Sequence, residues 1–408
     1  MILKALYEDR YRQTILFLSL FQTCGIRLFS GIGILLSLII FFLCIKSVRP
    51  NLKYALPIVI VTSLFLIIKG MPFSFIINCE MIVFNAFLLI EIYKSNNFIK
   101  DLYKVLTFLF IHGLMCFVLA IVIPDDLWIN INGGIPTQTL GYLFYRPLNS
   151  MLIPGVYRLM GLAWEPGCMQ LFLNLLLFLK IKNKEKTASL LWCILAVILT
   201  GSTVGYFILM VNALYYVKSN NMKKMLRTMW ILFPFILLAF PFIETNIVSK
   251  MGMSESGSMN SSGVIRYRDF YVGLKCLINH LLTGIDMSNL TINPIYQKYE
   301  YEAIESITGS ADVWYDCFDY TAGGYTNGLF TSTMLWGIGG IYLLYNFTKS
   351  RIWRKEIGSS WIYVPLIFCL TFISEPITNT VFFYFIAFFN LCEKGNKTLY
   401  LRLKFKLK

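Results

Sequence analysis

The sequence predicts an all-α fold, a polytopic membrane helical bundle with about twelve transmembrane helices. The first observation is composition: 57% of the 408 residues are hydrophobic and only 14% are charged, whereas soluble domains are about 45–50% apolar and ~25% charged. The second is the grouping of apolar residues into separate runs, and the third is the placement of the basic residues between them. The ten cysteines contain no C-x-x-C pair, so neither a disulfide framework nor a zinc site is expected.

Twelve apolar runs are the expected spans, because a helix of ~20 apolar residues crosses ~30 Å of hydrocarbon. The first run follows three basic residues and has no cleavage-site signature after it, so we expect a retained span rather than a signal peptide. The whole chain, 1–408, is expected to form a single integral membrane domain. The runs are Ile15–Phe29, Gly31–Ile45, Tyr54–Ile68, Phe73–Ile92, Tyr103–Ile123, Leu159–Leu179, Ala188–Leu199, Val204–Val217, Met229–Ile243, Gly328–Phe347, Trp361–Ile373 and Ile377–Leu391.

The basic residues predict the orientation. Of the 36 lysines and arginines, 27 fall in the N-terminal segment, in the turns that follow the even-numbered spans and in the C-terminal tail. Because lysine and arginine accumulate in short cytoplasmic segments, both termini are expected in the cytoplasm. The net charge of +14 therefore reflects topology and not nucleic-acid binding.

Two segments on the opposite side are long, namely 124–158 and 244–327. Loops of this length without a role are uncommon, so function is expected on the outer face. In the second loop, Arg266–Leu282 places apolar residues at helical spacing, which predicts an amphipathic helix on the outer membrane surface. The alternative is a lid helix that only covers the bundle.

The segment from Arg158 to Gly167 places a cation and a carboxylate at the mouth of the sixth span. Glu165 precedes Pro166 in apolar sequence, and an ionisable group at membrane depth usually faces a cavity or a partner. The alternative is an ion pair between Glu165 and Arg158 that fixes the helix. Glu375 repeats the Glu-Pro pattern at another outer turn, where it could also be simply solvated.

Four outer arginines are candidate phosphate ligands, because the planar guanidinium suits bidentate binding. Singly, each could instead bind lipid head groups. The residues are Arg146, Arg158, Arg266 and Arg268.

Motifs for other chemistry are missing from the sequence. It contains no D-x-D, P-loop, G-x-S-x-G or H-E-x-x-H pattern, so nucleotide-sugar, ATP and zinc chemistry lack support. Neither a metal site nor a cofactor is expected.

Four local patterns resemble the Wzy-type polymerases of O-antigen and capsule, in the larger family that includes the O-antigen ligases. They are Arg158-x-x-Gly161-x-x-x-Glu165-Pro166, Thr200-Gly-Ser-Thr203, Arg266 followed by a helix and Leu282-Thr-Gly284, and Gly324-Tyr-Thr-Asn327 leading into Leu335-Trp-Gly-Ile-Gly-Gly340. The twelve-span layout and the two long outer loops are also similar. At the fourth pattern the ligases carry a His-Asn pair, and here Thr326 takes the histidine's place, which favours a polymerase.

The resemblance implies a glycosyltransferase that joins oligosaccharide repeat units carried on undecaprenyl pyrophosphate, at the outer face of the bacterial cytoplasmic membrane. Arginines would hold the leaving pyrophosphate and a carboxylate would act as general base. The expected partners are the lipid-linked oligosaccharide and membrane lipid, with a chain-length regulator and a flippase as further partners, and no nucleic acid. Glu165 and Arg266 are the expected catalytic residues, and the expected substrate-binding residues are Arg158, Arg146, Arg268, Asn327 and Glu375.

Three alternatives remain open at this point. One is a ligase-type glycosyltransferase of the same family, and another is a flippase or transporter of lipid-linked oligosaccharide. Many transporters are built from two similar halves, and no such repeat is found here. The third is a membrane scaffold or receptor, which would tolerate substitution at Glu165 and Arg158.

Overall fold

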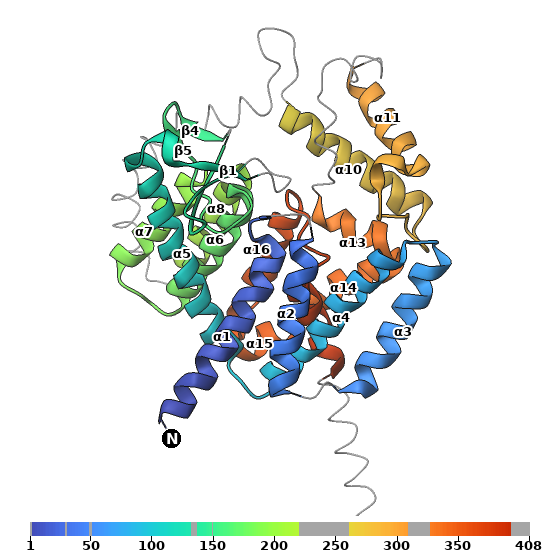
Figure 1. Ribbon diagram of the computed structural model, residues 1–408, viewed down its shortest axis with the longest axis horizontal. Helices are drawn as coiled ribbons and strands as arrows, with labels where there is room; N and C mark the ends of the chain where they lie inside the picture. The colour runs from blue at the N-terminus through green and yellow to red at the C-terminus, as the bar shows by residue number, and fades with distance from the viewer. Residues whose placement is uncertain are drawn as a thin grey trace, which may run out of the picture.

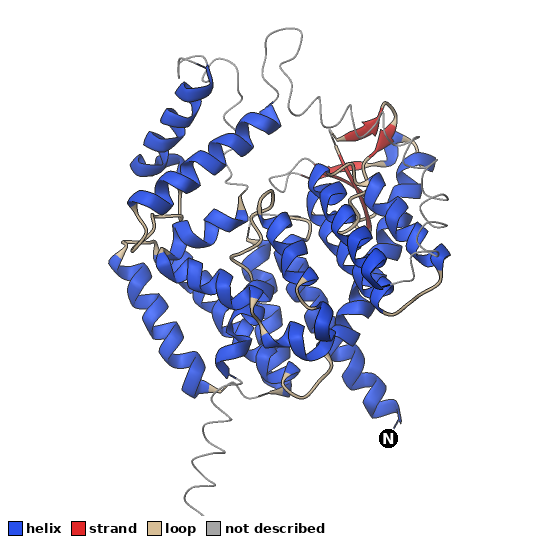
Figure 2. Ribbon diagram, turned by 180° about the vertical axis from the view of Figure 1, so that it is seen from behind, coloured by secondary structure: helices blue, strands red, loops and turns tan. Residues whose placement is uncertain are grey.

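The computed structural model describes residues 2–28, 31–48, 51–131, 137–148, 150–219, 261–308 and 327–392. This part of the chain is mostly helical, with a few short strands gathered at one corner of the molecule (Figures 1 and 2). The helices before the first long loop are α1 Ile2–Cys24, α2 Ile32–Ser47, α3 Leu52–Ile68, α4 Phe73–Tyr93 and α5 Phe98–Val122. Those that follow are α6 Pro166–Lys182, α7 Thr187–Leu199, α8 Thr203–Ser219, α10 Ser261–Asn279, α11 Pro294–Thr308, α13 Gly328–Trp336, α14 Ile338–Thr348, α15 Arg351–Ile357, α16 Tyr363–Phe372 and a last helix, Val381–Cys392.

Two of the described helices, α4 and α5, are long and apolar enough to cross a membrane. Five further helices are apolar but span only 10–17 residues: α2, α3, α7, α16 and the last helix. Helices thus occur at the expected apolar runs, but a bundle of twelve full-length spans is not shown. The ninth expected span, Met229–Ile243, lies outside the described residues.

The expected single span Gly328–Phe347 is two helices, α13 and α14, which meet at Gly337. Its φ of 57° lies in the left-handed region that favours glycine. A Cβ here would also lie 2.4 Å from the carbonyl oxygen of Leu282, so the loop after α10 packs directly on the break. The Ile285 amide donates to the Met334 carbonyl at 2.7 Å, and Lys69 Nζ donates to the Ile285 carbonyl at 2.6 Å. The segment Leu282–Gly284 and the segment Leu335–Gly340, both singled out in the sequence, therefore lie against each other.

The first long loop, 124–158, contains β-structure, which the sequence analysis did not predict. Strands β1 Ile129–Ile131, β2 Thr137–Leu140 and β3 Phe144–Pro147 form an antiparallel sheet in the order β1-β2-β3. A second pair is formed by β4 Met151–Ile153 and β5 Val156–Tyr157. The described part of the chain is therefore mostly α with a small β element. The strands were not predicted because they are too short for alternation to be recognised in the sequence.

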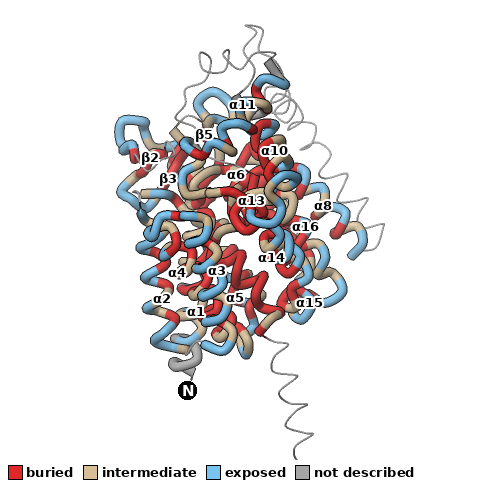
Figure 3. The backbone as a smooth tube through the Cα atoms, turned by 90° about the vertical axis from the view of Figure 1, so that its right-hand side faces the viewer, coloured by how far each residue is buried: buried red, intermediate tan, exposed pale blue. Residues whose placement is uncertain are grey.

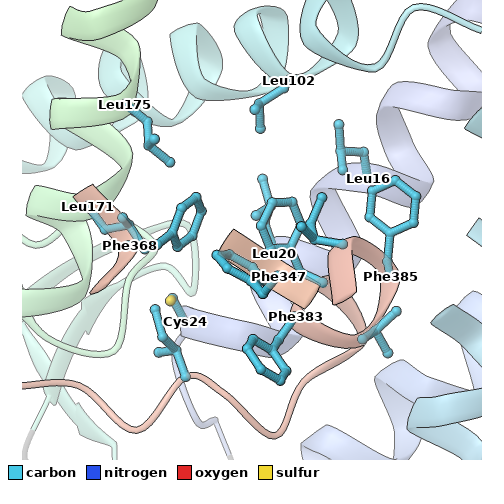
Figure 4. Close-up of a cluster of buried hydrophobic side chains, with 14 of the residues drawn as sticks. Leu16, Leu20, Cys24, Leu102, Leu171, Leu175, Phe347, Phe368, Phe383 and Phe385 are labelled. Atoms are coloured by element: carbon cyan, nitrogen blue, oxygen red, sulfur yellow. The ribbon is translucent and has the colours of Figure 1, made fainter. Parts of the chain in front are cut away.

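The hydrophobic core lies between the helices, and the buried residues run through the centre of the molecule (Figure 3). Side chains from α1, α5, α6, α16 and the last helix converge in it, among them Leu20, Leu171 and Phe383 (Figure 4). Phe347 is fully buried and stacks on Phe383 with ring centroids 5.2 Å apart. Such aromatic pairs add about 0.5–1.5 kcal/mol each beyond their buried area. This packing joins segments that are distant in sequence.

The expected amphipathic helix is present as α10, but two of its charged residues, Arg268 and Asp269, are turned inward. Arg268 and Asp269 are buried against α11, where Arg268 pairs with Asp269 at 2.8 Å and with Glu300 at 2.9 Å. The apolar residues Phe270 and Ile278 are exposed, by 51% and 68%. The buried charged residues thus join α10 to α11 through ion pairs, and an apolar stripe of α10 remains exposed on the surface.

Candidate functional site

Glu165, Cys168 and Glu375 lie together where α6 begins. One ligand atom from each side chain lies within 4.8 Å of those of the other two. Glu165 immediately precedes α6, whose first residue is Pro166, a residue suited to that position. The Glu165 carboxylate makes no capping hydrogen bond with the helix, so its oxygens face the cluster instead. The Cys168 thiol donates to Glu375 Oε2 at 3.5 Å.

Glycine at position 167 permits this close approach. A Cβ built there would lie 2.0 Å from Glu375 Oε1 and 3.0 Å from Glu375 Cδ. The Glu375 side chain, 3% exposed, therefore rests directly on the backbone of the first turn of α6. Glu375 itself belongs to the turn between α16 and the last helix, and its amide donates to the Thr371 carbonyl at 2.9 Å.

Two carboxyl groups in this position cannot both carry a charge without a large cost. Burial raises the pKa of Glu375 well above its usual range, and the neighbouring Glu165 carboxylate and Cys168 thiol raise it further. The charge of Arg266 acts in the opposite direction. The neutral, protonated form is therefore the favoured form of Glu375, and a second negative charge beside Glu165 is avoided.

Arg158 is fixed beside this cluster by the turn between α7 and α8. Its Nε donates to the Thr200 carbonyl at 2.6 Å, and its two terminal nitrogens donate to the Gly201 carbonyl and to Ser150 Oγ, each at 3.0 Å. These bonds use three of the five N–H groups of the guanidinium. Among the described residues no ion pair joins Arg158 to Glu165, so the alternative in which such a pair fixes the helix has no support in the geometry.

Arg266 and Asn327 approach the same region from other elements. Arg266 is exposed on α10, and its charge acts on both Arg158 and Glu375. Asn327 caps α13, because its side chain accepts from the amides of Leu329 and Phe330. The next residue, Gly328, faces the Glu375 backbone so closely that a Cβ would lie 2.3 Å from its carbonyl oxygen.

Two of the expected substrate-binding arginines lie elsewhere and are engaged by the protein. The Arg146 guanidinium lies between the rings of Trp128 and Tyr157, 4.5 and 4.2 Å from their centroids, and pairs with Asp125 at 2.6 Å. Arg268 is buried between α10 and α11, where it forms the ion pairs with Asp269 and Glu300 described above. The structure thus brings together Glu165, Glu375, Arg158, Arg266 and Asn327, and separates Arg146 and Arg268 from them.

In the part of the chain that the structure describes, the same three side chains form the one group of His, Cys, Asp or Glu residues close enough to hold a metal ion. Glu165, Cys168 and Glu375 offer carboxylate oxygens and one sulfur, a number of protein ligands that matches a catalytic zinc site but falls short of a structural zinc site or a calcium site. A bound cation would have to displace the proton that burial favours on Glu375, because a coordinating carboxylate must be ionised. Proton transfer needs no such displacement.

Sequence reasoning missed Cys168, Ser150 and the role of Gly167. It singled out Thr200-Gly-Ser-Thr203, but not the contact of this turn with Arg158. Cys168 follows Glu165 by three residues at a helix start, a spacing that places both on one face of the first turn. That spacing was the only available signal. The Glu375 contact joins residues far apart in the sequence and leaves no local pattern.

Comparison with known proteins adds no assignment. No protein-family model, no curated protein and no solved structure matches this chain.

Proposed function

We propose that the protein is a polysaccharide polymerase of the Wzy type, which joins oligosaccharide repeat units carried on a polyprenyl pyrophosphate. The observation that carries the proposal is the meeting of Glu165 and Glu375 beside Arg158 and Arg266. Burial and its neighbours raise the pKa of Glu375, which favours its protonated form, and we assign Glu165 the role of base. The charge of Arg158 interacts with both carboxyl groups, and the charge of Arg266 acts on Glu375. Glycosyl transfer from a lipid pyrophosphate can use these groups, a general base for the attacking hydroxyl and positive charge for the leaving pyrophosphate.

The proposed reaction is a substitution at the anomeric carbon of the donor sugar. A hydroxyl oxygen of the acceptor unit forms the new glycosidic bond while the bond from that carbon to the pyrophosphate oxygen breaks. Glu165 takes the proton of the attacking hydroxyl, and the electron pair of the broken bond leaves on the pyrophosphate. Arg266 and the two remaining N–H groups of Arg158 stabilise the charge that develops there.

Glu375 supports Glu165 in this proposal. A protonated Glu375 next to Glu165 can donate a hydrogen bond to it, which orients the carboxylate toward the substrate without adding a second negative charge. Asn327, through Gly328 and the Glu375 turn, positions the acceptor side. Arg146 and Arg268 are assigned supporting roles in the outer loops, since the protein itself engages their guanidinium groups.

The proposed setting is the bacterial cytoplasmic membrane, with twelve spans, both termini in the cytoplasm and the site on the outer face. Two helices of sufficient length and apolarity support a membrane location. The shorter apolar helices would cross with help from flanking residues and local thinning of the bilayer. The uneven distribution of basic residues supports the orientation.

The test is the lipid-linked product of cells with and without the chain. A polymerase gives a ladder of repeat units that is still attached to the polyprenyl lipid, and cells that lack the chain accumulate the single unit. If the protein is a ligase, cells that lack it should keep the same lipid-linked chain lengths but fail to transfer the chains to a different acceptor. If it is a flippase, cells that lack it should keep the single unit on the cytoplasmic side, where an external glycosidase cannot reach it in intact spheroplasts.

A further inference from the structure

A pocket of about 360 Å³ opens at the end of α5 that lies opposite the proposed active site along the helix. It is formed where the start of α5, the end of α6 and α15 meet, and its size falls within the range of small-ligand sites. The residues that line it include three lysines and a single carboxylate. They are Asn97, Ile99, Lys100, Tyr103, Lys104, Leu179, Lys182, Asn183 and Glu356.

The single carboxylate of the pocket is already engaged. The two Glu356 oxygens accept from the backbone amides of Phe98 and Ile99, at 3.2 and 2.7 Å. These are the first amides of α5, which would otherwise be unsatisfied. Glu356 thus serves the helix and is not paired with a lysine side chain of the pocket.

The positive charges of the pocket are poorly compensated. Among the described residues, Lys104 makes no ion pair, and Lys182 Nζ donates only to the Glu356 backbone carbonyl at 2.9 Å. Lys100 reaches Asp9 at 3.6 Å and its side chain is 59% exposed. The pocket therefore offers at least two ammonium groups to an anion.

An exposed apolar stripe begins at the pocket and follows α5 away from it. After Lys104, the helix exposes Phe108, Ile111, Met115 and Val118, each by about half. Their spacing of three and four residues places them on one face of the helix. A ligand with a charged head and an apolar chain would contact the lysines with one end and this stripe with the other.

We propose that this pocket binds the phosphate of an anionic phospholipid, with the acyl chains lying along the exposed face of α5. Basic pockets between helices at a membrane surface are known to hold anionic head groups. The stripe selects a lipid over a free phosphate ion, which would gain nothing from it. The proposal requires that α5 crosses a membrane, and it does not depend on the glycosyl-transfer reaction.

The test uses the purified full chain in detergent, titrated with phosphatidylglycerol or with phosphatidylcholine of the same acyl chains, with bound lipid counted by native mass spectrometry. Wild-type protein is expected to bind phosphatidylglycerol more tightly. Lys104→Ala should weaken that binding about fivefold, and Lys104→Ala with Lys182→Ala about 30-fold. Lys104→Arg should retain it, because the charge is kept.

The matched control is Lys46→Ala, which removes an exposed lysine at the end of α2, outside the pocket. It should bind phosphatidylglycerol like wild type. Equal binding of the two lipids, or equal effects of Lys104→Ala and Lys46→Ala, would overturn the proposal. Displacement of the lipid by an equal concentration of inorganic phosphate would assign the pocket to a free anion and also overturn it. Because no outcome involves polymer synthesis, these results are independent of the proposed function.

Discussion

Replacing Gly167 with alanine perturbs the carboxyl cluster without removing any polar group. The added methyl carbon would lie 2.0 Å from Glu375 Oε1, a distance that real side chains do not adopt, so the Glu375 carboxyl must move. Overpacking of this kind costs about 1–3 kcal/mol, and a displacement of ~1 Å in a catalytic group can cost about 10²-fold in rate. We expect Gly167→Ala to lose roughly one to two orders of magnitude of activity and about 1–3 kcal/mol of stability.

The matched control is Gly339→Ala. Gly167 and Gly339 are both the second residue of a helix, α6 and α14, so helix propensity changes equally in the two variants. At Gly339 a Cβ would meet only Trp336 Cβ, at 3.6 Å, an ordinary contact. This variant should match or slightly exceed the stability of wild type, by up to about 1 kcal/mol.

A double substitution shows whether the effect passes through Glu375. In a Glu375→Ala background the added methyl group has no carboxyl group to displace, so Gly167→Ala should cost almost nothing there. The coupling free energy from the cycle is expected to be about 1–3 kcal/mol. Activity is measured as chain-extended lipid-linked product per amount of membrane-inserted protein, and stability as the unfolding midpoint in detergent. Wild-type activity and stability in Gly167→Ala would refute the arrangement of Glu375 against α6.

Three further predictions concern the charged residues. Arg266→Ala should lower activity by roughly one to two orders of magnitude, because a charge-assisted hydrogen bond is worth ~1.5–3 kcal/mol. The control Lys298→Ala, on the exposed surface of the same loop, should keep wild-type activity. Equal activity of the two variants would exclude Arg266 from the reaction. Arg158→Lys should lower the free energy of unfolding by about 3 kcal/mol, because one ammonium group cannot replace three nitrogens that bond Thr200, Gly201 and Ser150; an unchanged unfolding midpoint would contradict this. The pKa of Glu375 is raised in the folded protein, so the stability of wild type relative to Glu375→Gln should be highest below about pH 4.3, the pKa in the unfolded chain. This relative stability should fall as pH rises through the folded pKa. Unfolding midpoints measured from acid to alkaline pH should show the fall, and a difference that does not change with pH would contradict the prediction.

Apolar runs predicted where helices form but not how long or how straight they are. The break at Gly337 illustrates the limit, because the glycine needs its positive φ only once the Leu282 carbonyl packs against it. That contact comes from the loop after α10 and leaves no sign in the sequence around Gly337. The short strands of the loop 124–158 were not predicted for a related reason, since two to four residues carry too little periodicity.

The candidate site was predictable in type but not in membership. Glu165 was identified because a carboxylate in apolar sequence needs a polar partner, and its partner proved to be Glu375 rather than Arg158. The four candidate arginines carry the same charge in the sequence. Only tertiary contacts separate Arg146, held between two aromatic rings, from Arg266, which remains exposed near the cluster.

The central claim is that Glu165 accepts the proton in polymer extension. The most direct measurement is the rate at which purified protein extends a synthetic polyprenyl-pyrophosphate-linked repeat unit, compared between wild type, Glu165→Gln and Glu305→Gln, the last an exposed carboxylate of α11. Glutamine keeps the size and hydrogen bonding of glutamate but cannot take a proton, so we predict a fall of ~10²–10⁴-fold for Glu165→Gln and no change for Glu305→Gln. Wild-type specific activity in folded Glu165→Gln would contradict the account.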